Sequence, residues 1–576
     1  MGVFLYSNKT INTEKIERVF HTRGHKEIVN HKISKGTLLS SKKVIVDNEN
    51  YLSTCELNAL GGGSSDFAVG IGTYCYKGKY GKEALKSVYL DLDYVLSENP
   101  IYGHWAFCIH KGGHTYIFND MNGTLRLYVH QQGDKVVISS SELAVMVCME
   151  NFQFDIINLS AFLTETYASE IPFLKNIDFI NARYYYDINE NDLPEIKKRN
   201  IPPVPRIEDF TEAKNYVKAL LKEQAEQLIP IIGKKTVYAD ATGGLDSRLI
   251  ACFLKHYNVD FDYINYPIYG PDSEIANILA KGINRKLHIQ TNLPIGNDVV
   301  EHIGEFDFGH NFYRQYPNER WILEHEFEFS GALGECLCIP EYYSDDDIQL
   351  MKNPRLEVII EKLLKKQMMS KTVKKQYVQK FTSYIESRYE LPRGKSLSEC
   401  QQSELSQALA GDLGGDSMYN SGAQAMCYFY SLFTEWHFNH FINDISFKVR
   451  EGRKLSIALI KDLDSELASL PFVSRCFTRR NSVQEIDSLP VKYKTNATIK
   501  KCIPNVLINI IFMLMGRKAF NTVLFDEVPK NDYKQAIDLK TVFEQKYLYK
   551  ELLEKLYSIE VIKQFLQEGK LQINEK

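Results

Sequence analysis

The chain has 576 residues, of which 44% are hydrophobic and 25% are charged, a composition that excludes a disordered or fibrous protein. This length is more than one hydrophobic core supports, so we expect two or more domains. The net charge of −4, from 69 Lys and Arg against 73 Asp and Glu, provides no overall positive field that would attract nucleic acid or an anionic membrane.

Residues 1–188 are expected to form a sheet-rich domain. Short runs that alternate between apolar and polar residues are separated there by Gly and Asn, as in Gly103–His110, Thr115–Phe118 and Lys135–Ser139. Such a period of two is typical of half-buried strands. Residues 189–209 then contain a polar stretch with several prolines, which predicts a linker between domains.

The pattern changes after this linker, because predicted strands now alternate with predicted helices. The four elements of the pattern are the helices Phe210–Leu228 and Asp272–Ala280 and the strands Thr236–Ala239 and Phe261–Tyr266. This alternation predicts a parallel α/β core over residues 210–350, with helices on both faces of the sheet. Residues 351–576 have mainly helical patterns, and we expect them to continue the same domain.

The turn after the strand at Thr236–Ala239 is the most informative part of the sequence. From Tyr238 to Arg248 it reads Tyr-Ala-Asp-Ala-Thr-Gly-Gly-Leu-Asp-Ser-Arg, and an apolar helical run follows. Two glycines let main-chain N–H groups approach an anion, and the start of a helix favours negative charge, so the turn predicts a phosphate site. Asp246 fits beside phosphates if a magnesium ion bridges them. The alternative is a tight strand-to-helix turn that binds no ligand.

At this turn the sequence resembles a known family. Thr242-Gly-Gly-Leu-Asp-Ser247 is similar to the SGGxDS pyrophosphate loop of the ATP pyrophosphatases, and the surrounding residues resemble the synthetase domain of class B asparagine synthetase and its relatives, the β-lactam synthetases and lasso-peptide cyclases. The resemblance implies an α/β domain of the ATP-pyrophosphatase, adenine nucleotide α-hydrolase-like type, with ATP and Mg²⁺ bound. The residues that it implies for binding ATP and pyrophosphate are Thr242, Gly243, Gly244, Asp246, Ser247, Arg248, Tyr263, Asp272 and Gly331.

A second segment of the family pattern lies before the helical region. Phe327–Glu335 resembles the family's SGEGSDE segment, with Ser330 and Gly331 matching and Glu335 in place of an Asp. The resemblance therefore implies that Asp246 and Glu335 hold the magnesium ion on the departing pyrophosphate. For Glu335 the alternative is an ordinary surface carboxylate.

The N-terminal half resembles the glutaminase domain of the same family. The motifs that carry this likeness are Gly103–Phe107, Ile117–Asp120, Asn122–Gly123, Leu127–Tyr128 and Ser140–Leu143. The family's glutaminase is an Ntn-hydrolase β-sandwich whose nucleophile is a cysteine directly after the initiator methionine. Gly2 occupies that position here, so we expect residues 1–188 to form a degenerate Ntn-hydrolase-like sandwich that does not hydrolyse glutamine.

Three further residues have alternative roles. Arg248 stands where asparagine synthetase has a Ser, and its guanidinium suits a phosphate, a substrate carboxylate or a salt bridge to a neighbouring acid. By position in the family, Lys492 would stabilise charge near the phosphates. Glu435, in the aromatic-rich predicted helix around Phe433–Trp436, is the candidate base for the incoming amine. The alternatives are a solvated surface lysine and a glutamate that caps a helix or forms a salt bridge.

Together these features predict an ATP-dependent carbon–nitrogen ligase that forms AMP and pyrophosphate. Such an enzyme adenylates a substrate carboxylate and transfers the acyl group to an amine, and a peptide macrolactam of the lasso type is one product class that the resemblance offers. The alternatives are an ammonia-dependent asparagine synthetase or a related ligase of envelope-sugar biosynthesis, and a non-catalytic scaffold. A silent scaffold has no physical need for an anion-binding turn with a metal-binding acid.

The cysteines and the apolar segments indicate the compartment. Eleven cysteines occur without CxxC pairs, and no basic segment followed by a long apolar run opens the sequence, so we expect a cytoplasmic protein with reduced thiols. Val506–Met515 is about half the length of a bilayer span. The expected partners are a small-molecule or peptide carboxylate and a precursor peptide or its processing enzyme, with neither nucleic acid nor a membrane.

Overall fold

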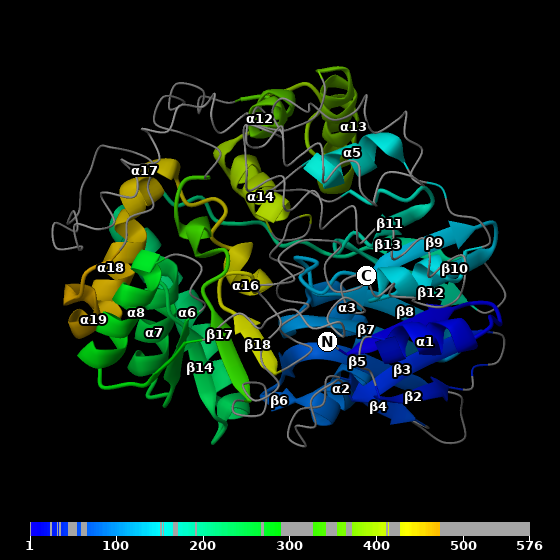
Figure 1. Ribbon diagram of the computed structural model, residues 1–576, viewed down its shortest axis with the longest axis horizontal. Coiled ribbons are helices and arrows are strands. Elements are labelled where there is room, and N and C mark those ends of the chain that lie inside the picture. Colours follow the sequence, from blue (N-terminus) through cyan, green and yellow to red (C-terminus); the bar gives the residue numbers. More distant parts are fainter. Residues whose placement is uncertain are drawn as a thin grey trace, which may run out of the picture.

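The structure is a computed structural model of the chain. It describes residues 2–22, 26–31, 33, 36–43, 54–58, 66–149, 153, 155–164, 171–189, 193–265, 270–289, 326–340, 354–364, 371–410, 413 and 427–472. Antiparallel sheets in the first half and a parallel sheet in the second half confirm the predicted mixed α/β class at this level (Figure 1).

Two antiparallel sheets form the first half. The first sheet has the strand order β11 (Ile177–Phe179), β9 (Tyr128–Gln132), β10 (Lys135–Ser139), β1 (Val3–Ser7), β3 (Thr37–Lys43) and β2 (Lys26–His31). The second has the order β13 (Glu195–Lys198), β12 (Tyr184–Asn189), β8 (His114–Asn119), β7 (Tyr102–Lys111), β5 (Phe67–Tyr76) and β4 (Thr54–Asn58), and β6 (Lys79–Tyr80) pairs with β5. Side chains of both sheets, such as Phe4 and Ile117, share one buried cluster, so the sheets pack face to face.

Helices that the sequence patterns did not predict cover the outer faces of both sheets. The helices that share a core with the first sheet are α1 (Glu14–Thr22), α4 (Glu142–Met146) and α5 (Ile156–Thr164). The helices on the second sheet are α2 (Gly81–Leu90) and α3 (Leu92–Glu98). Because each sheet has helices on one face and the other sheet on its second face, the strands are buried on both faces, and this explains the fully buried ten-residue strand β5.

The second half contains a five-stranded parallel sheet. Its strand order is β16 (Leu287–Ile289), β15 (Asp262–Asn265), β14 (Val237–Asp240), β17 (Phe327–Ser330) and β18 (Tyr428–Ser431). β15 lies within the predicted strand 261–266, and β14 overlaps the predicted strand 236–239 but ends one residue later. β18 lies in the part of the chain that we expected to be mainly helical. The sequence pattern missed it because a four-residue strand has no measurable period of two.

The helices of the second half pack around this sheet and beside the sandwich (Figure 1). They are α6 (Phe210–Ile232), α7 (Leu245–His256), α8 (Gly270–Gly282), η1 (Gly334–Leu337), α12 (Leu356–Leu363), α13 (Lys371–Tyr389), α14 (Glu399–Ala410), α16 (Trp436–Asn439), α17 (Phe447–Arg450), η4 (Glu451–Arg453), α18 (Lys454–Leu463) and α19 (Ser465–Ser469). The stretch expected as a linker is not wholly irregular, because β13 lies in it and pairs with β12. No helix in the described part of the chain combines the length and apolar character needed to cross a bilayer.

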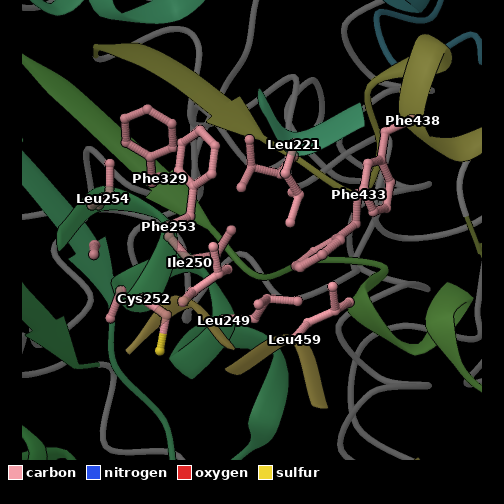
Figure 2. Packing of buried hydrophobic residues seen from close by; sticks show 14 of the residues in the cluster. Leu221, Leu249, Ile250, Cys252, Phe253, Leu254, Phe329, Phe433, Phe438 and Leu459 are labelled. Atoms are coloured by element: carbon pink, nitrogen blue, oxygen red, sulfur yellow. The ribbon is translucent and has the colours of Figure 1, made fainter. Parts of the chain in front are cut away.

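Helix α7 lies at the centre of the second core. At most 1% of the surface of Ile250 and of Phe253 is exposed to solvent. Figure 2 shows these side chains packed with Phe329 of β17, Leu221 of α6 and Leu459 of α18. Each fully buried side chain of this size contributes about 1.5–3 kcal/mol, so this packing fixes the position of α7 and of the turn that leads into it.

The two halves are joined at β18, which runs beside the second antiparallel sheet. The Phe429 N–H donates to Thr73 Oγ1 at 3.2 Å, and the Ser431 N–H donates to His104 Nε2 at 3.2 Å. Burial lowers the pKa of His104 to about 3, so this histidine is neutral and its Nε2 is an acceptor at physiological pH. Residues 73 and 104 therefore satisfy main-chain donors of an edge strand more than 300 positions away in the sequence.

Candidate functional site

The predicted phosphate turn lies between β14 and α7. Thr242 Oγ1 and Ser247 Oγ are 2.9 Å apart, and Ser247 Oγ also accepts from the Thr242 N–H at 3.2 Å. The Gly244 N–H donates to Thr242 Oγ1 at 3.2 Å, and Gly244 is the N-terminal cap of α7. The two hydroxyls that the sequence places on either side of the glycines thus bond to each other across the turn. The twelve-residue helix α7 begins at the end of this turn.

The second predicted segment lies directly against this turn. A Cβ atom added to Gly331 would lie 2.7 Å from the Ser247 nitrogen, and one added to Gly334 would lie 2.3 Å from Asp246 Cβ. Only glycine permits approaches this close at both positions. The segments 242–247 and 330–335, which the sequence linked only through the family resemblance, therefore form one site at the carboxyl edge of the parallel sheet, where α/β proteins bind ligands.

The two predicted metal ligands lie on the two halves of this site. Asp246 is in the first turn of α7 and Glu335 is in the first turn of η1. The pKa of the nearby Cys336 thiol is raised well above its usual value, first by burial and next by the negative charge of Glu335. The charge of Asp246 raises this pKa as well. Asp246 Oδ2 is 4.0 Å from Arg453 Nη1, so a cation already lies on one side of this carboxylate.

These acids suit Mg²⁺ only together with a nucleotide. Within the described ranges, no group of three or more His, Cys, Asp or Glu side chains is arranged to hold a metal ion. Two carboxylates leave most positions of a six-oxygen shell to other ligands, and Mg²⁺ commonly takes these from water and substrate phosphates. The donor set of Asp246 and Glu335 therefore fits a magnesium ion that protein and triphosphate hold jointly.

The Arg248 side chain binds main-chain carbonyls of residues 467–471 rather than the phosphate turn. Its guanidinium is 1% exposed and donates to the carbonyl oxygens of Leu467 at 3.2 Å, Leu470 at 2.5 Å and Pro471 at 2.5 Å. Burial lowers the pKa of Arg248 to about 10, which still leaves it charged at neutral pH. The hydrogen bonds satisfy carbonyls at the end of α19, so we leave Arg248 out of the nucleotide-binding set proposed below.

We expect Arg248→Met to destabilise the protein by about 2 kcal/mol, because three charge-assisted hydrogen bonds are lost while the cost of burying the charge is removed. Urea unfolding gives this free energy. Arg248→Lys is the matched control, and it should recover only part of the loss because an ammonium cannot bridge three separate carbonyls. A variant of unchanged stability that binds Mg·ATP weakly would instead return Arg248 to the phosphates.

Tyr263 and Asp272 lie on the neighbouring strand and helix. Tyr263 is in β15 beside β14, and its N–H donates to the Lys286 carbonyl at 2.9 Å within the sheet. Asp272 is in the first turn of α8, the helix that follows β15. Tyr263 is thus the second residue of β15, and Asp272 follows the carboxyl end of that strand. The contacts of the described residues do not define an adenine pocket.

The structure describes one of the two predicted catalytic residues, Glu435. Glu435 is fully buried as the N-terminal cap of α16, where its Oε2 accepts from the Phe438 N–H at 3.2 Å and its Oε1 lies 2.8 Å from His437 Nδ1. This is the capping role that the sequence offered as the alternative. Lys492 lies outside the described residues.

A polar cavity of about 60 Å³ adjoins the site and was not predicted. Side chains of both halves line it, among them Asn122, Arg183, Glu404 and Asn443. Asn443 Oδ1 is enclosed and has no hydrogen-bond partner. Leu333, which lies between the two site glycines, also lines the cavity and has a φ of 61°, a value that is uncommon for a residue other than glycine. Leu333 thus links the cavity with segment 330–335.

No protein-family model matches the chain, and no curated protein matches it either. Among solved structures, glutamine phosphoribosylpyrophosphate (PRPP) amidotransferase from B. subtilis, complexed with ADP and GMP, is 10% identical with a TM-score of 0.22, over 52% of this chain and 70% of that chain. A second structure, described as the allosteric regulatory enzyme of purine biosynthesis, is 10% identical with a TM-score of 0.24, over 52% of this chain and 67% of that chain. These scores are too low to support a function, which must come from the residues of the site.

Proposed function

We propose that the protein is an ATP-dependent, amide-forming ligase that adenylates a substrate carboxylate and transfers the acyl group to an amine. One observation carries this proposal. Gly331 and Gly334 bring the segment 330–335 into contact with Asp246 and Ser247, so that a helix start and two carboxylates meet at the carboxyl edge of a parallel sheet. This combination suits a triphosphate bound with Mg²⁺.

The proposed chemistry asks the chain mainly to bind and orient its substrates. The start of α7 would hold the phosphates so that the carboxylate attacks the α-phosphorus in line. That bond forms as the bond to pyrophosphate breaks, and an amine then attacks the acyl carbon and releases AMP. When bound by Asp246 and Glu335, Mg²⁺ would neutralise charge on the pyrophosphate.

In this proposal the first half is a degenerate glutaminase-like domain and residues 210–576 are the synthetase part. The layered sandwich suits an Ntn-hydrolase-like fold, and Gly2 supplies no nucleophile for glutamine. The amine would therefore come from the substrate itself or from free ammonia. The polar cavity beside Leu333 is the nearest described space for a substrate group.

The proposal is tested by following ATP with candidate carboxylic acids, including peptide acids and aspartate. We expect exchange of labelled pyrophosphate into ATP and release of AMP in the presence of the correct acid. Formation of ADP without AMP would refute adenylation. Exchange with aspartate and ammonia would favour an asparagine synthetase over a peptide ligase, and no binding of Mg·ATP at all would leave the scaffold as the better reading.

Glutamine provides the control for the first half. Incubation with glutamine alone should give no glutamate above the rate without protein, since a thiol nucleophile is missing at position 2. Measurable glutamate would show that another group hydrolyses the amide.

A further inference from the structure

Two acidic side chains lie on neighbouring strands directly before the two site segments. β14 and β17 are parallel, and Tyr238 pairs with Glu328 in their register. Residues two apart on a strand share a face, so Asp240 lies on the same face as Glu328, one step closer to the turn. Both positions belong to central strands of a parallel sheet, where apolar residues are the rule.

The contacts of Asp240 connect the two segments. Its carboxyl group forms hydrogen bonds with the Glu328 carboxyl, the Ser330 side chain and the Gly331 N–H. Glu328 is 1% exposed, and although Asp240 as a residue is partly exposed, its Oδ1 atom is enclosed and has no partner. Two carboxylates are both acceptors only, so a hydrogen bond between them requires a proton on one of the two.

We propose that Asp240 and Glu328 share one proton and act as a positioning pair that holds segment 330–335 against the phosphate turn. The positioning role at a phosphate site rests on the proposed function, whereas the shared proton does not depend on it. Asp240 lies two residues before Thr242 and binds Gly331, and the space for a Cβ at Gly331 is filled by the Ser247 nitrogen 2.7 Å away. A shift of Asp240 therefore moves the second segment relative to the start of α7.

The surroundings favour a neutral Asp240. Its pKa is raised well above the usual value by burial and next by the negative charge of Glu328. An ionised group would also leave the enclosed Oδ1 without compensation. The O–H of the uncharged acid, on Oδ2, can donate to Glu328.

Other titratable groups also face this part of the sheet. Those that the described strands and their neighbours place there are Tyr238, Asp262, His288, Cys427 and His104. Burial keeps the Cys427 thiol protonated and His104 neutral, because it raises the pKa of the first and lowers that of the second. Asp262 and His288 form their own contact at 3.5 Å. A comparison of wild type with a single variant at Asp240 cancels their contributions.

The test compares the stability of wild type and Asp240→Asn over pH 4.5 to 8. Because the folded pKa of Asp240 is raised, its contribution is fully present below the unfolded value of about 4 and is lost as pH rises toward the folded value. The amide reproduces the neutral acid and does not titrate. We therefore expect the melting temperature of wild type to fall by about 2 °C or more relative to Asp240→Asn across this range. Parallel profiles would overturn the shared proton.

Positioning is tested by the affinity for Mg·ATP, measured calorimetrically on the full chain. Asp240→Ala should weaken binding by about tenfold or more, whereas Asp240→Asn should keep it within about threefold, because the amide retains the bond to Gly331. Asp262→Asn, on the same face of the sheet, is the matched control and should bind as wild type does. Equal affinity of Asp240→Ala and wild type would overturn the positioning role. If wild type itself does not bind Mg·ATP, the proposed function fails, while the pH profiles still decide the proton.

Discussion

Replacing Gly331 with alanine should lower the rate of AMP formation by about 100-fold and destabilise the protein by about 1–3 kcal/mol. The added Cβ would lie 2.7 Å from the Ser247 nitrogen and 3.0 Å from the Asp246 carbonyl carbon. Both are backbone atoms at the start of α7, and the packing of that helix leaves them little freedom to move. Either the turn or the segment 330–335 must therefore shift. Pyrophosphate exchange and urea unfolding measure the two effects.

Gly244→Ala is the matched control for stability, since it adds the same methyl group at the same site. A Cβ there would lie 3.4 Å from Thr242 Oγ1, and the residue has an extended backbone with φ −79° that alanine adopts readily. The main-chain N–H that bonds to Thr242 is kept. We expect a change in stability below about 0.5 kcal/mol. If Gly331→Ala behaves like this control, the close approach of the two segments is not what builds the site.

The sequence predicted those parts of the site that depend on local signals. The order of strand, two glycines and helix start is encoded within eleven residues, and the structure places β14 and α7 on either side of that turn. Asp246, Ser247 and Gly331 also lie together, because the carboxyl ends of parallel strands share one edge of the sheet. Alternation predicted a sheet-rich first half, since a period of two is visible within a single strand.

The remaining features depend on residues far apart in the sequence. Arg248 lies in the predicted turn, yet its three carbonyl partners come from residues 467–471, and no local pattern indicates this. The pairing of Asp240 with Glu328 requires the register of two strands that are separated by more than 80 residues. The local signal for this pair is an ionisable residue, Asp240, at the end of an otherwise apolar strand. Its partner can be identified only once the neighbouring strand is known.

Asp246→Asn should reduce AMP formation by about 100-fold to 1000-fold while changing stability by less than about 1 kcal/mol. The amide has the shape of the acid, so the packing against Gly334 is preserved, but the negative charge that would hold Mg²⁺ is lost. The nearby guanidinium of Arg453, 4.0 Å away, would then face no charge on this side chain. Pyrophosphate exchange over a range of Mg²⁺ concentrations measures the loss, and excess Mg²⁺ should restore part of the rate.

Glu212→Gln is the control that separates the effect of metal binding from the effect of the helix dipole. Glu212 is an exposed acid in the first turn of α6, so it interacts with a helix start as Asp246 does but lies outside the site. We expect this variant to keep the rate of wild type. If both variants lose the same small amount of stability and neither loses activity, Asp246 is an ordinary helix-terminal acid. A loss confined to Asp246→Asn and relieved by Mg²⁺ requires a metal-dependent role, because the dipole contribution is common to both positions.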